Sequence, residues 1–493
     1  MSNTPTAKLA EPKKGLDRFF KISERGSTVG REVRGGLVTF FAMCYIIVLN
    51  PLILGTLPSD SGTWIGGGTD GPNLAGVAAT TALVAGVLTI LMGVVANFPM
   101  AIAAGLGLNA VVTFGIAVLP GMTFADAMGI VVLEGIIILI LVLTGFREAV
   151  FKAVPVELKV AISVGIGLFI ALVGFVNGGF VTPGDGTPLV LGIDNALQTW
   201  PVLVFVVGLA LMVILSARKV RGAILISIIS ATVLAVILQK IHNLSTVGNP
   251  VNPDPKGWQL NAPSLEGSPV AVPDFSLLGQ FNLFDSWSKI GVVTVLLLVF
   301  SLLLADFFDT MGTMVAVGAE AKLLDEEGNP AESHKILVVD SLGAIAGGLG
   351  GVSSNTAYIE STTGAAEGAR TGLASVVTGV MFLLATFLSP LVALVPNEAA
   401  APALVFVGYL MMTQVTDIKW NDIQIALPAF LTIVVMPFTY SITAGIGMGF
   451  LAYVLIQIVL GKAKKVHPLM WVASVMFIIY FTLEPILQAS QAG

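Results

Sequence analysis

The side chains from which disulfide frameworks, metal centres and nucleophilic active sites are built are scarce in this sequence. Cysteine occurs once, as Cys44, so no internal disulfide can form. The three histidines (His242, His334 and His467) fall in polar connecting stretches, and hydroxyl groups such as that of Ser361 have no neighbouring base. An active site would need a nucleophile beside a base, and a metal would need a cluster of ligands. We therefore expect no enzyme, no bound metal and no cofactor.

Charged side chains are scarce as well. They make up 11% of the 493 residues, against 55% hydrophobic residues and a mean hydropathy of +0.93. A soluble domain carries roughly 25% charged residues, so this chain cannot cover a water-facing surface and must have lipid as part of its solvent. Its 54 glycines fit a membrane bundle, in which small residues let helices approach closely. Residues 1–30 are polar, so we expect no cleavable signal peptide.

Long apolar runs follow one another along most of the chain. A membrane-spanning helix needs roughly 20 mostly apolar residues, and fourteen runs approach that pattern. They cover residues 33–55, 76–97, 98–119, 126–145, 158–176, 199–216, 220–239, 289–318, 335–349, 353–367, 372–395, 400–414, 423–438 and 441–461. A further apolar run at 468–488 either spans the membrane as well or lies at its interface.

The basic residues predict how these spans are oriented. If the N-terminus is cytoplasmic, all but three of the 24 lysines and arginines fall on the cytoplasmic side, in accord with the positive-inside rule. The exceptions are Lys240, Lys256 and Lys289. We expect a multi-pass protein of the cell (inner) membrane with a cytoplasmic arm at 1–30 and an external loop at 240–288.

Two predicted spans are too irregular to be simple lipid-facing helices. Segment 98–119 is interrupted by proline and glycine, and segment 353–367 is rich in serine, threonine and asparagine. Each is third in its half of seven, and broken segments at matching positions in two halves point to an inverted repeat and to a binding site at the membrane midplane. The expected domains are a first repeat at 31–239, a second repeat at 289–461 and an apolar tail at 462–493.

Segment 289–318 carries the strongest candidate chemistry. Asp306, Asp309, Thr310 and Thr313 are three or four residues apart, so a helix places them on one face. A charged residue at the bilayer centre costs ~2.5–3.5 kcal/mol even on a lenient scale. Two carboxylates on one face therefore imply water, a partner or a bound proton, and the alternative is structural pairing inside the bundle.

Four more polar residues lie in apolar surroundings. Glu360 and Asn109 belong to the two irregular segments, whereas Glu134 and Asp340 stand alone on apolar spans. Glu360 could instead lie at the membrane edge, and Asn109 could satisfy loose backbone groups. For the lone Glu134 and Asp340 we favour structural hydrogen bonding over a functional role.

No lysine or arginine is expected in the middle of the membrane, so these carboxylates and amides would act without a cationic partner. Such a site disfavours an anionic substrate and favours a neutral or weakly basic heterocycle, because carboxylates accept hydrogen bonds from N–H groups. Phe307 and Phe308 could stack on a flat ring, although aromatic side chains on a membrane helix more often serve packing. A carboxylate at this depth could also carry a proton.

Five stretches give the sequence a family resemblance. They are NFPMAIAAGLGLNA at 97–110, ADFFDTMGT at 305–313, NTAYIESTTG at 355–364, APAL at 401–404 and IALPAFLT at 425–432. Together they resemble the AzgA-like hypoxanthine/guanine/adenine permeases of the nucleobase–ascorbate (nucleobase–cation symporter) group. The resemblance covers nearly the whole chain beyond residue 15.

The resemblance implies an all-α polytopic membrane protein with a fold like that of the uracil transporter. Such a fold has fourteen spans as two inverted repeats of seven, with short strands in spans three and ten. Spans 1–4 and 8–11 would form a core domain, and spans 5–7 and 12–14 a gate domain. The resemblance also implies that Asn109, Asp306 and Glu360 hold substrate and that Asp309 is important. The tail beyond residue 465 departs from the fourteen-span pattern.

The resulting hypothesis is a proton symporter that imports hypoxanthine, guanine and adenine. Asp306 and Glu360 would accept hydrogen bonds from the purine, Asn109 would bind another edge, and Asp306, Asp309 or Glu360 would carry the proton. Three alternatives stay open: a pyrimidine, xanthine or urate permease, an anion transporter of the same fold, and a channel or sensor. Na⁺ could replace H⁺. A homodimer is common in this fold, and no nucleic acid partner is expected.

Overall fold

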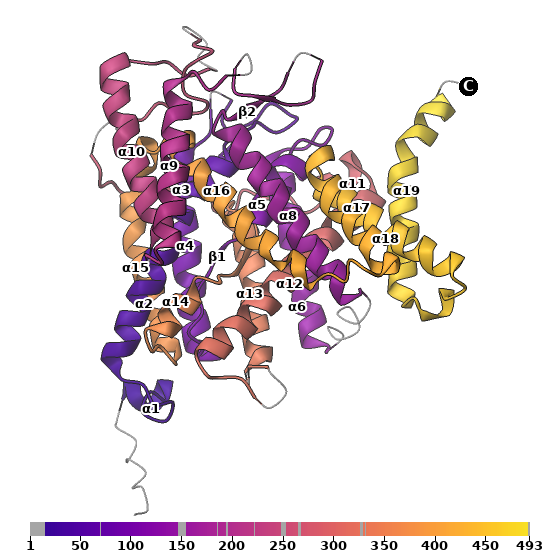
Figure 1. The fold of residues 1–493 in the computed structure, drawn as a ribbon. Coiled ribbons are helices and arrows are strands. Elements are labelled where there is room, and N and C mark those ends of the chain that lie inside the picture. Colours follow the sequence, from indigo (N-terminus) through magenta and orange to yellow (C-terminus); the bar gives the residue numbers. More distant parts are fainter. Residues whose placement is uncertain are drawn as a thin grey trace, which may run out of the picture.

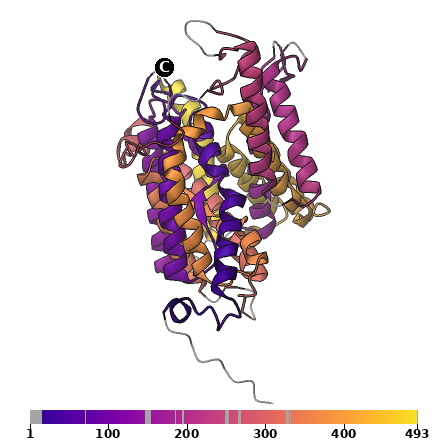
Figure 2. The ribbon, with the colours of Figure 1, turned by 90° about the vertical axis from the view of Figure 1, so that its left-hand side faces the viewer.

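The computed structural model describes residues 15–69, 71–145, 154–184, 186–193, 196–220, 222–247, 253–264, 268–325, 329–330 and 332–491. This part of the chain forms a bundle of helices with connecting segments at both ends (Figures 1 and 2). It contains ten helical stretches that are long and apolar enough to cross a membrane.

The ten stretches are built from the following elements. They are α2 (Val29–Met43) with α3 (Ile46–Leu54), α4 (Leu74–Leu91) with the π-helix η1 (Met92–Ala96), α6 (Phe124–Leu143), α8 (Val156–Asn177), α9 (Trp200–Ala217), α10 (Ala223–His242), α12 (Val292–Glu320), α15 (Gly372–Ala385) with the 3₁₀ helix η3 (Thr386–Leu394), α16 (Asn397–Met412) with η4 (Thr413–Asp417), and α18 (Ile442–Val459). The predicted helical membrane fold is thereby confirmed.

The remaining elements are shorter or less apolar. They are α1 (Leu16–Phe20), β1 (Ile102–Ala104), α5 (Leu106–Ala110) with the π-helix η2 (Val111–Ile116), β2 (Val181–Thr182), β3 (Val190–Leu191), α11 (Asp285–Lys289), α13 (Ser333–Leu349), β4 (Asn355–Ala357), α14 (Ser361–Ala366), α17 (Ile423–Thr439), η5 (Ala463–Lys465) and α19 (Pro468–Gln491). Four predicted spans fall here, because α13 and α17 have only 17 residues each and segments 98–119 and 353–367 break into strand and short helix. The count of fourteen spans therefore stays a prediction.

The two irregular segments meet through an antiparallel strand pair, as predicted for spans three and ten. In β1 and β4, Ile102 lies opposite Ala357 and Ala104 opposite Asn355, and all six strand residues are buried. The ladder is extended at both ends by backbone hydrogen bonds of 3.0 Å, one at Gly105 and one at Tyr358. Buried backbone groups must find partners, and here each broken segment supplies them to the other.

Glycines bring several helices into backbone contact. A Cβ on Gly93 would lie 2.3 Å from the Gly372 carbonyl oxygen, and one on Gly372 would lie 2.0 Å from that of Gly93. The same reciprocal contact joins Gly167 of α8 to Gly408 of α16. The high glycine content thus serves close helix packing, as expected for a membrane bundle.

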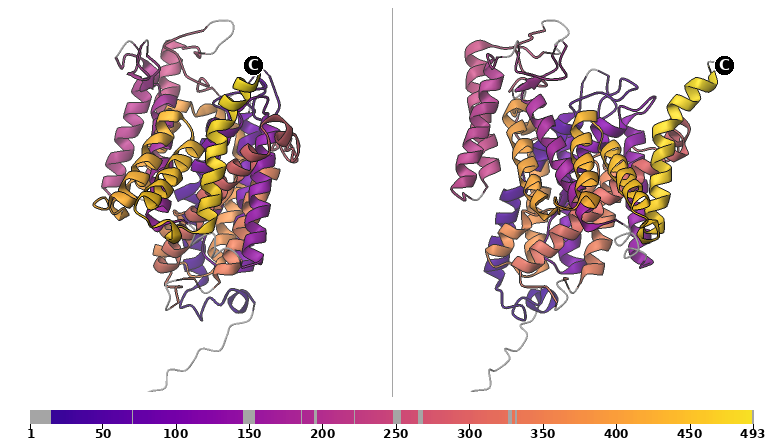
Figure 3. Two further views of the ribbon diagram at one scale, coloured as in Figure 1. Left: turned by 90° about the vertical axis from the view of Figure 1, so that its right-hand side faces the viewer. Right: turned by 45° about the vertical axis from the view of Figure 1, so that its right-hand side comes forward.

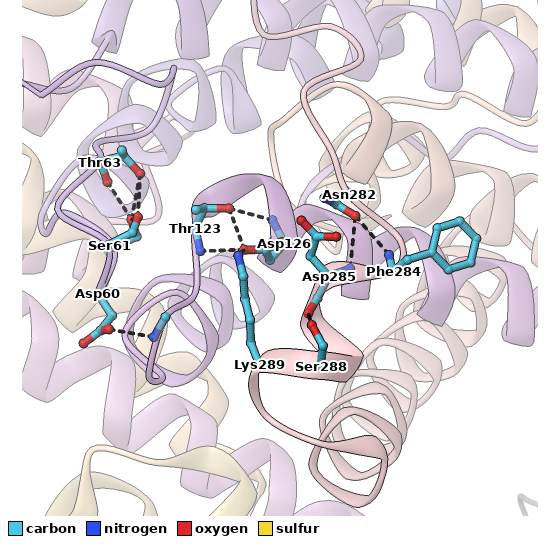
Figure 4. Close-up of polar contacts among 12 residues, drawn as sticks. Asp60, Ser61, Thr63, Thr123, Asp126, Asn282, Phe284, Asp285, Ser288 and Lys289 are labelled. Atoms are coloured by element: carbon cyan, nitrogen blue, oxygen red, sulfur yellow. Dashed lines mark hydrogen bonds and ion pairs between the residues drawn. The ribbon is translucent and has the colours of Figure 1, made fainter.

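Polar contacts fix the connections at the end of the bundle opposite α1. Lys289 of α11 forms an ion pair of 2.7 Å with Asp126, which also accepts hydrogen bonds from the backbone and hydroxyl of Thr123 (Figure 4). Asp60 accepts the backbone N–H of Gly121 at 2.7 Å in the same region. The start of α6 is therefore tied to two separate connecting segments.

The apolar run at 468–488 forms part of α19. This helix runs along one edge of the bundle, opposite the paired helices α9 and α10 (Figure 3). It packs against α18 and α12. Whether α19 is a fifteenth span or an interfacial helix stays open as predicted, because its apolar part is shorter than the ten long stretches.

Candidate substrate-binding site

The strand pair places one polar residue of each broken segment in, or directly before, the short helix that follows the strand. Asn109 lies on α5, which follows β1, and Glu360 lies directly before α14, which follows β4. The Asn109 side chain is fully buried, and neither its oxygen nor its nitrogen has a hydrogen-bond partner among the described residues. A buried amide without partners is costly, so it is available to a ligand.

Glu360 is half-buried and is held by a phenol from the first long stretch. The Tyr45 hydroxyl donates a hydrogen bond to the Glu360 carboxylate, and Tyr45 itself is buried at the junction of α2 and α3. A donor of this kind fixes one oxygen and leaves the other lone pairs of the carboxylate free to accept. Tyr45 was not predicted as a site residue from the sequence, although a phenol within an apolar membrane span could have indicated a hydrogen-bonding role.

Helix α12 brings the two aspartates to the strand pair. It packs against β4, α14 and α5, and the Thr310 hydroxyl lies 2.8 Å from that of Thr356 on β4. Asp306 is fully buried, and neither carboxylate oxygen has a hydrogen-bond partner within 3.5 Å among the described residues, although the Thr356 hydroxyl and the Glu134 carboxyl lie beside it. The Asp309 carboxyl lies close enough to those of Asp306 and Glu360 to interact with both electrostatically. The predicted acids are therefore gathered in one place.

Asp309 differs from Asp306 in its access to solvent. Its side chain is exposed although it lies well inside the long helix α12, and a Cβ on Gly312, one turn further, would meet no atom within 4 Å. An exposed carboxylate at such a position needs water. This face of α12 is therefore incompletely covered by other elements.

The aromatic residues predicted as stacking partners lie next to these acids in the sequence. Phe307 is buried and takes part in an interaction with a neighbouring residue. Phe308 is part of α12, but its side chain lies outside what the structure describes. For Phe307, burial agrees with packing as well as with stacking on a substrate.

Further buried polar groups surround the strand pair. Glu134 of α6 accepts a hydrogen bond of 3.2 Å from the Ser354 hydroxyl, and Asp340 of α13 interacts with Thr310 and with the Ala357 backbone. Asn355 is fully buried, and its amide has no partner among the described residues. Of these, Glu134 and Asp340 were predicted to form structural hydrogen bonds, whereas Ser354 and Asn355 were not singled out within their polar segment.

No cation balances these acids in the described part of the chain. The ion pairs found there lie in loops or near helix ends, and none includes Asp306, Asp309, Glu360, Glu134 or Asp340. The described residues also contain no group of three or more histidine, cysteine or acidic side chains arranged to hold a metal ion. The site therefore offers hydrogen-bond acceptors and titratable oxygens, which suit a ligand with N–H donors.

Comparison with known proteins identifies the family. The sequence matches the profile described as Permease family over residues 30–448. The chain belongs to this permease family. It is 37% identical over 477 residues to the guanine/hypoxanthine permease PbuG of Bacillus subtilis, covering 94% of this chain and 99% of the relative. It is 36% identical over 464 residues to the adenine permease AdeP of Escherichia coli, covering 94% and 95% of the two chains.

Other relatives agree with the resemblance noted from the sequence. The nucleobase transporter PlAzg2 of Paenibacillus larvae is 33% identical over 430 residues, covering 86% of this chain and 77% of the relative. The resemblance to AzgA-like permeases is thus confirmed, and a transporter rather than an enzyme is indicated.

Solved structures of transporters share the fold. The transmembrane domain of the cyanobacterial bicarbonate transporter BicA aligns with a TM-score of 0.56 at 14% identity, over 85% of this chain and 96% of that chain. Murine Slc26a9 in its inward-facing state aligns with a TM-score of 0.57 at 13% identity, over 92% and 74%. At these identities the likeness concerns the fold alone.

Proposed function

We propose that this permease imports the purine nucleobases hypoxanthine, guanine and adenine across the cell membrane together with a proton. The observation that carries the proposal is the similarity over almost the whole chain to permeases named for guanine, hypoxanthine and adenine. The acidic, cation-free site agrees with this substrate class, because purines present N–H donors and ring-nitrogen acceptors on one flat molecule.

Each candidate residue has a role that its surroundings support. Neither Asp306 oxygen has a hydrogen-bond partner within 3.5 Å among the described residues, and Glu360 has one oxygen bound to Tyr45, so both can accept N–H groups of a purine. Asn109 can donate and accept at another edge through its unpartnered amide. We assign substrate binding to these three, with the neighbouring Phe307 and Phe308 as candidates for stacking.

The coupled proton would bind to the same group of acids. Coulomb repulsion among Asp306, Asp309 and Glu360 disfavours ionisation of all three in a site with a low dielectric constant. A proton taken up with substrate reduces this repulsion, and its release on the other side restores it. Asp309, which is exposed, is the member of the group with direct access to water.

The transport movement is proposed to occur between a core and a gate domain built from two inverted repeats. In support, corresponding pairs of helices pack alike: α6 on α13 and α15 on α4, and likewise α9 on α10 and α17 on α18. In the predicted numbering, equivalent spans of the two repeats differ by seven. Spans 4 and 9 (α6 and α13) then correspond to spans 11 and 2 (α15 and α4), and spans 6 and 7 (α9 and α10) to spans 13 and 14 (α17 and α18). Rocking of one domain against the other around a fixed site would then provide alternating access.

The first experiment is uptake of labelled hypoxanthine by cells that lack their own purine permeases, with and without a protonophore. We expect uptake against a gradient that collapses with the protonophore and is inhibited by unlabelled adenine or guanine but not by uracil. Inhibition by uracil or xanthine instead of adenine or guanine would support one of the alternative specificities. Equilibration without accumulation would indicate a channel and contradict symport.

Two variants and a control test the residue assignments. D306N should abolish accumulation, because it removes an acceptor and a titratable group, and E360Q should weaken hypoxanthine inhibition. E398Q is the matched control, since Glu398 is also fully buried but bonds the backbone N–H of Gln259 in a loop, at 2.7 Å. Retained protonophore-sensitive accumulation in D306N would overturn its assignment.

A further inference from the structure

Glu134 of α6 borders the candidate site, next to α12 and Ser354, and has no role in the transport scheme above. Its carboxyl lies beside that of Asp306, where α6 packs against α12, and the Thr356 hydroxyl is the other polar neighbour of Asp306. Both side chains are fully buried. Two carboxylates can share a hydrogen bond only if one of them holds a proton, because an ionised carboxylate has acceptors and no donor.

The structure fixes Glu134 in this position from two sides. One of its oxygens accepts the Ser354 hydroxyl at 3.2 Å, while the Ser354 carbonyl accepts the Gly105 N–H at the end of the strand pair. Next to it, a Cβ on Gly135 would lie 2.6 Å from the Ile345 backbone nitrogen, so α6 and α13 are in direct backbone contact. Glu134 is therefore positioned by the same strand pair that positions the substrate residues.

No lysine, arginine or histidine of the described residues is placed to neutralise the pair. Helix α6 packs against α12, α13, α11 and η2. From α12 the facing acid is Asp306, from α13 it is Asp340, and η2 carries no titratable side chain. Asp285 and Lys289 are on α11, where Lys289 pairs with Asp126 (Figure 4), which is eight residues or about 12 Å along the helix from Glu134.

We propose that Glu134 is a positioning residue for proton coupling, which shares one proton with Asp306 and retains that proton while Asp306 accepts hydrogen bonds from the substrate. This inference rests on the proposed proton-coupled purine transport and adds a residue to it. The proton enters the pair before substrate binds and stays on the Glu134 oxygen during the movement. It leaves to water on the opposite side after substrate has left Asp306, which returns the pair to its starting state.

The test uses hypoxanthine binding to the purified protein as a function of pH. With one linked proton, the Kd of the wild type should rise about tenfold per pH unit above the range in which the pair is protonated. E134Q, whose amide can donate to Asp306 but cannot release a proton, should bind with a nearly pH-independent Kd. In vesicles it should exchange labelled for unlabelled hypoxanthine but fail to accumulate it, whereas E134D should retain pH dependence.

E398Q is the matched control, because Glu398 is an equally buried acid with one partnered and one unpartnered oxygen. It should behave as the wild type. A merely structural Glu134 would give E134Q a changed affinity or yield with an unchanged pH slope and retained accumulation, and this result would overturn the proposal. Loss of accumulation on replacing Na⁺ by K⁺ would also overturn it, since the pair would then serve a metal ion.

A second measurement, made on the wild type, tests the proposal even if E134Q does not fold. In the wild type, hypoxanthine should perturb the infrared C=O stretch of a protonated carboxylic acid, and absence of any perturbation overturns the shared proton. If the wild type binds no purine, the proposed function fails separately. In that case the shared proton is tested by comparing the substrate-free infrared spectra of the wild type and E134Q. Loss of a protonated-acid band in E134Q supports the shared proton, and identical spectra overturn it.

Discussion

Gly347 offers a sharp test of how the strand pair is held at the site. It lies on α13, where an added Cβ would be 2.0 Å from the Ser353 carbonyl oxygen and 3.1 Å from the Asn355 backbone nitrogen. Cβ atoms essentially never come within 3.0 Å of such atoms, so G347A must move α13 and this carbonyl apart by at least 1.0 Å, the difference between 3.0 and 2.0 Å. Ser353 has φ 70°, which leaves the turn little freedom to yield.

The displacement should pass directly into β4, because Ser353 is only two residues before Asn355. Overpacking of this kind typically costs about 1–3 kcal/mol of stability. A misplacement of about 1 Å in a binding constellation can reduce activity on the order of 100-fold. We therefore expect G347A to reach the membrane with lowered thermal stability and to lose nearly all hypoxanthine uptake.

The assay compares uptake and thermal stability in detergent, both normalised to the amount of protein in the membrane. G30A is the control, because Gly30 is also helical and a Cβ there would meet no atom within 4 Å. It should leave both quantities near the wild-type values. Wild-type uptake by G347A would refute the argument that contact with α13 sets the position of β4.

Two further changes test the side chains that support the site. T89V removes the hydroxyl that bonds both the N–H and the carbonyl of Ile102 at 3.0 Å, so we expect a loss of about 1–3 kcal/mol for each backbone group left unsatisfied. T80V on the same helix removes only a local bond and should cost less in the same thermal unfolding assay. Y45F removes the donor to Glu360 and should raise the hypoxanthine Kd roughly tenfold or more, and unchanged affinity would show that Tyr45 does not orient that carboxylate.

The broken segments could be predicted from the sequence because their signal is local. Proline, glycine and hydroxyl-bearing residues inside an otherwise apolar run are incompatible with an ordinary lipid-facing helix. Together with the family resemblance, this was sufficient to predict strands in segments 98–119 and 353–367, which the structure confirms as β1 and β4. The register of β1 against β4 could not be predicted from the sequence, because two three-residue strands carry no periodicity that fixes it.

Long-range contacts between single side chains were not predictable for a related reason. The Tyr45–Glu360 hydrogen bond joins residues 315 positions apart, and the Glu134–Ser354 bond joins residues 220 positions apart. Glu134 stands alone in an apolar helix, so local reasoning favoured a structural role. Its position beside Asp306 follows only from the packing of α6 against α12 and α13.

The arrangement explains how unbalanced acids can persist inside an apolar bundle. A continuous helix satisfies its own backbone, whereas the segment at β1 leaves backbone groups to side chains. The Thr89 hydroxyl bonds those of Ile102, and the Ser361 hydroxyl accepts the N–H of Ala101, directly before β1, at 3.0 Å. Hydroxyl groups thus hold the site together without any cation. Because no Lys or Arg of the described residues neutralises Asp306, a bound proton or Na⁺ or the N–H groups of a ligand would stabilise its charge. We infer that this requirement links proton binding to substrate binding at one place in the fold.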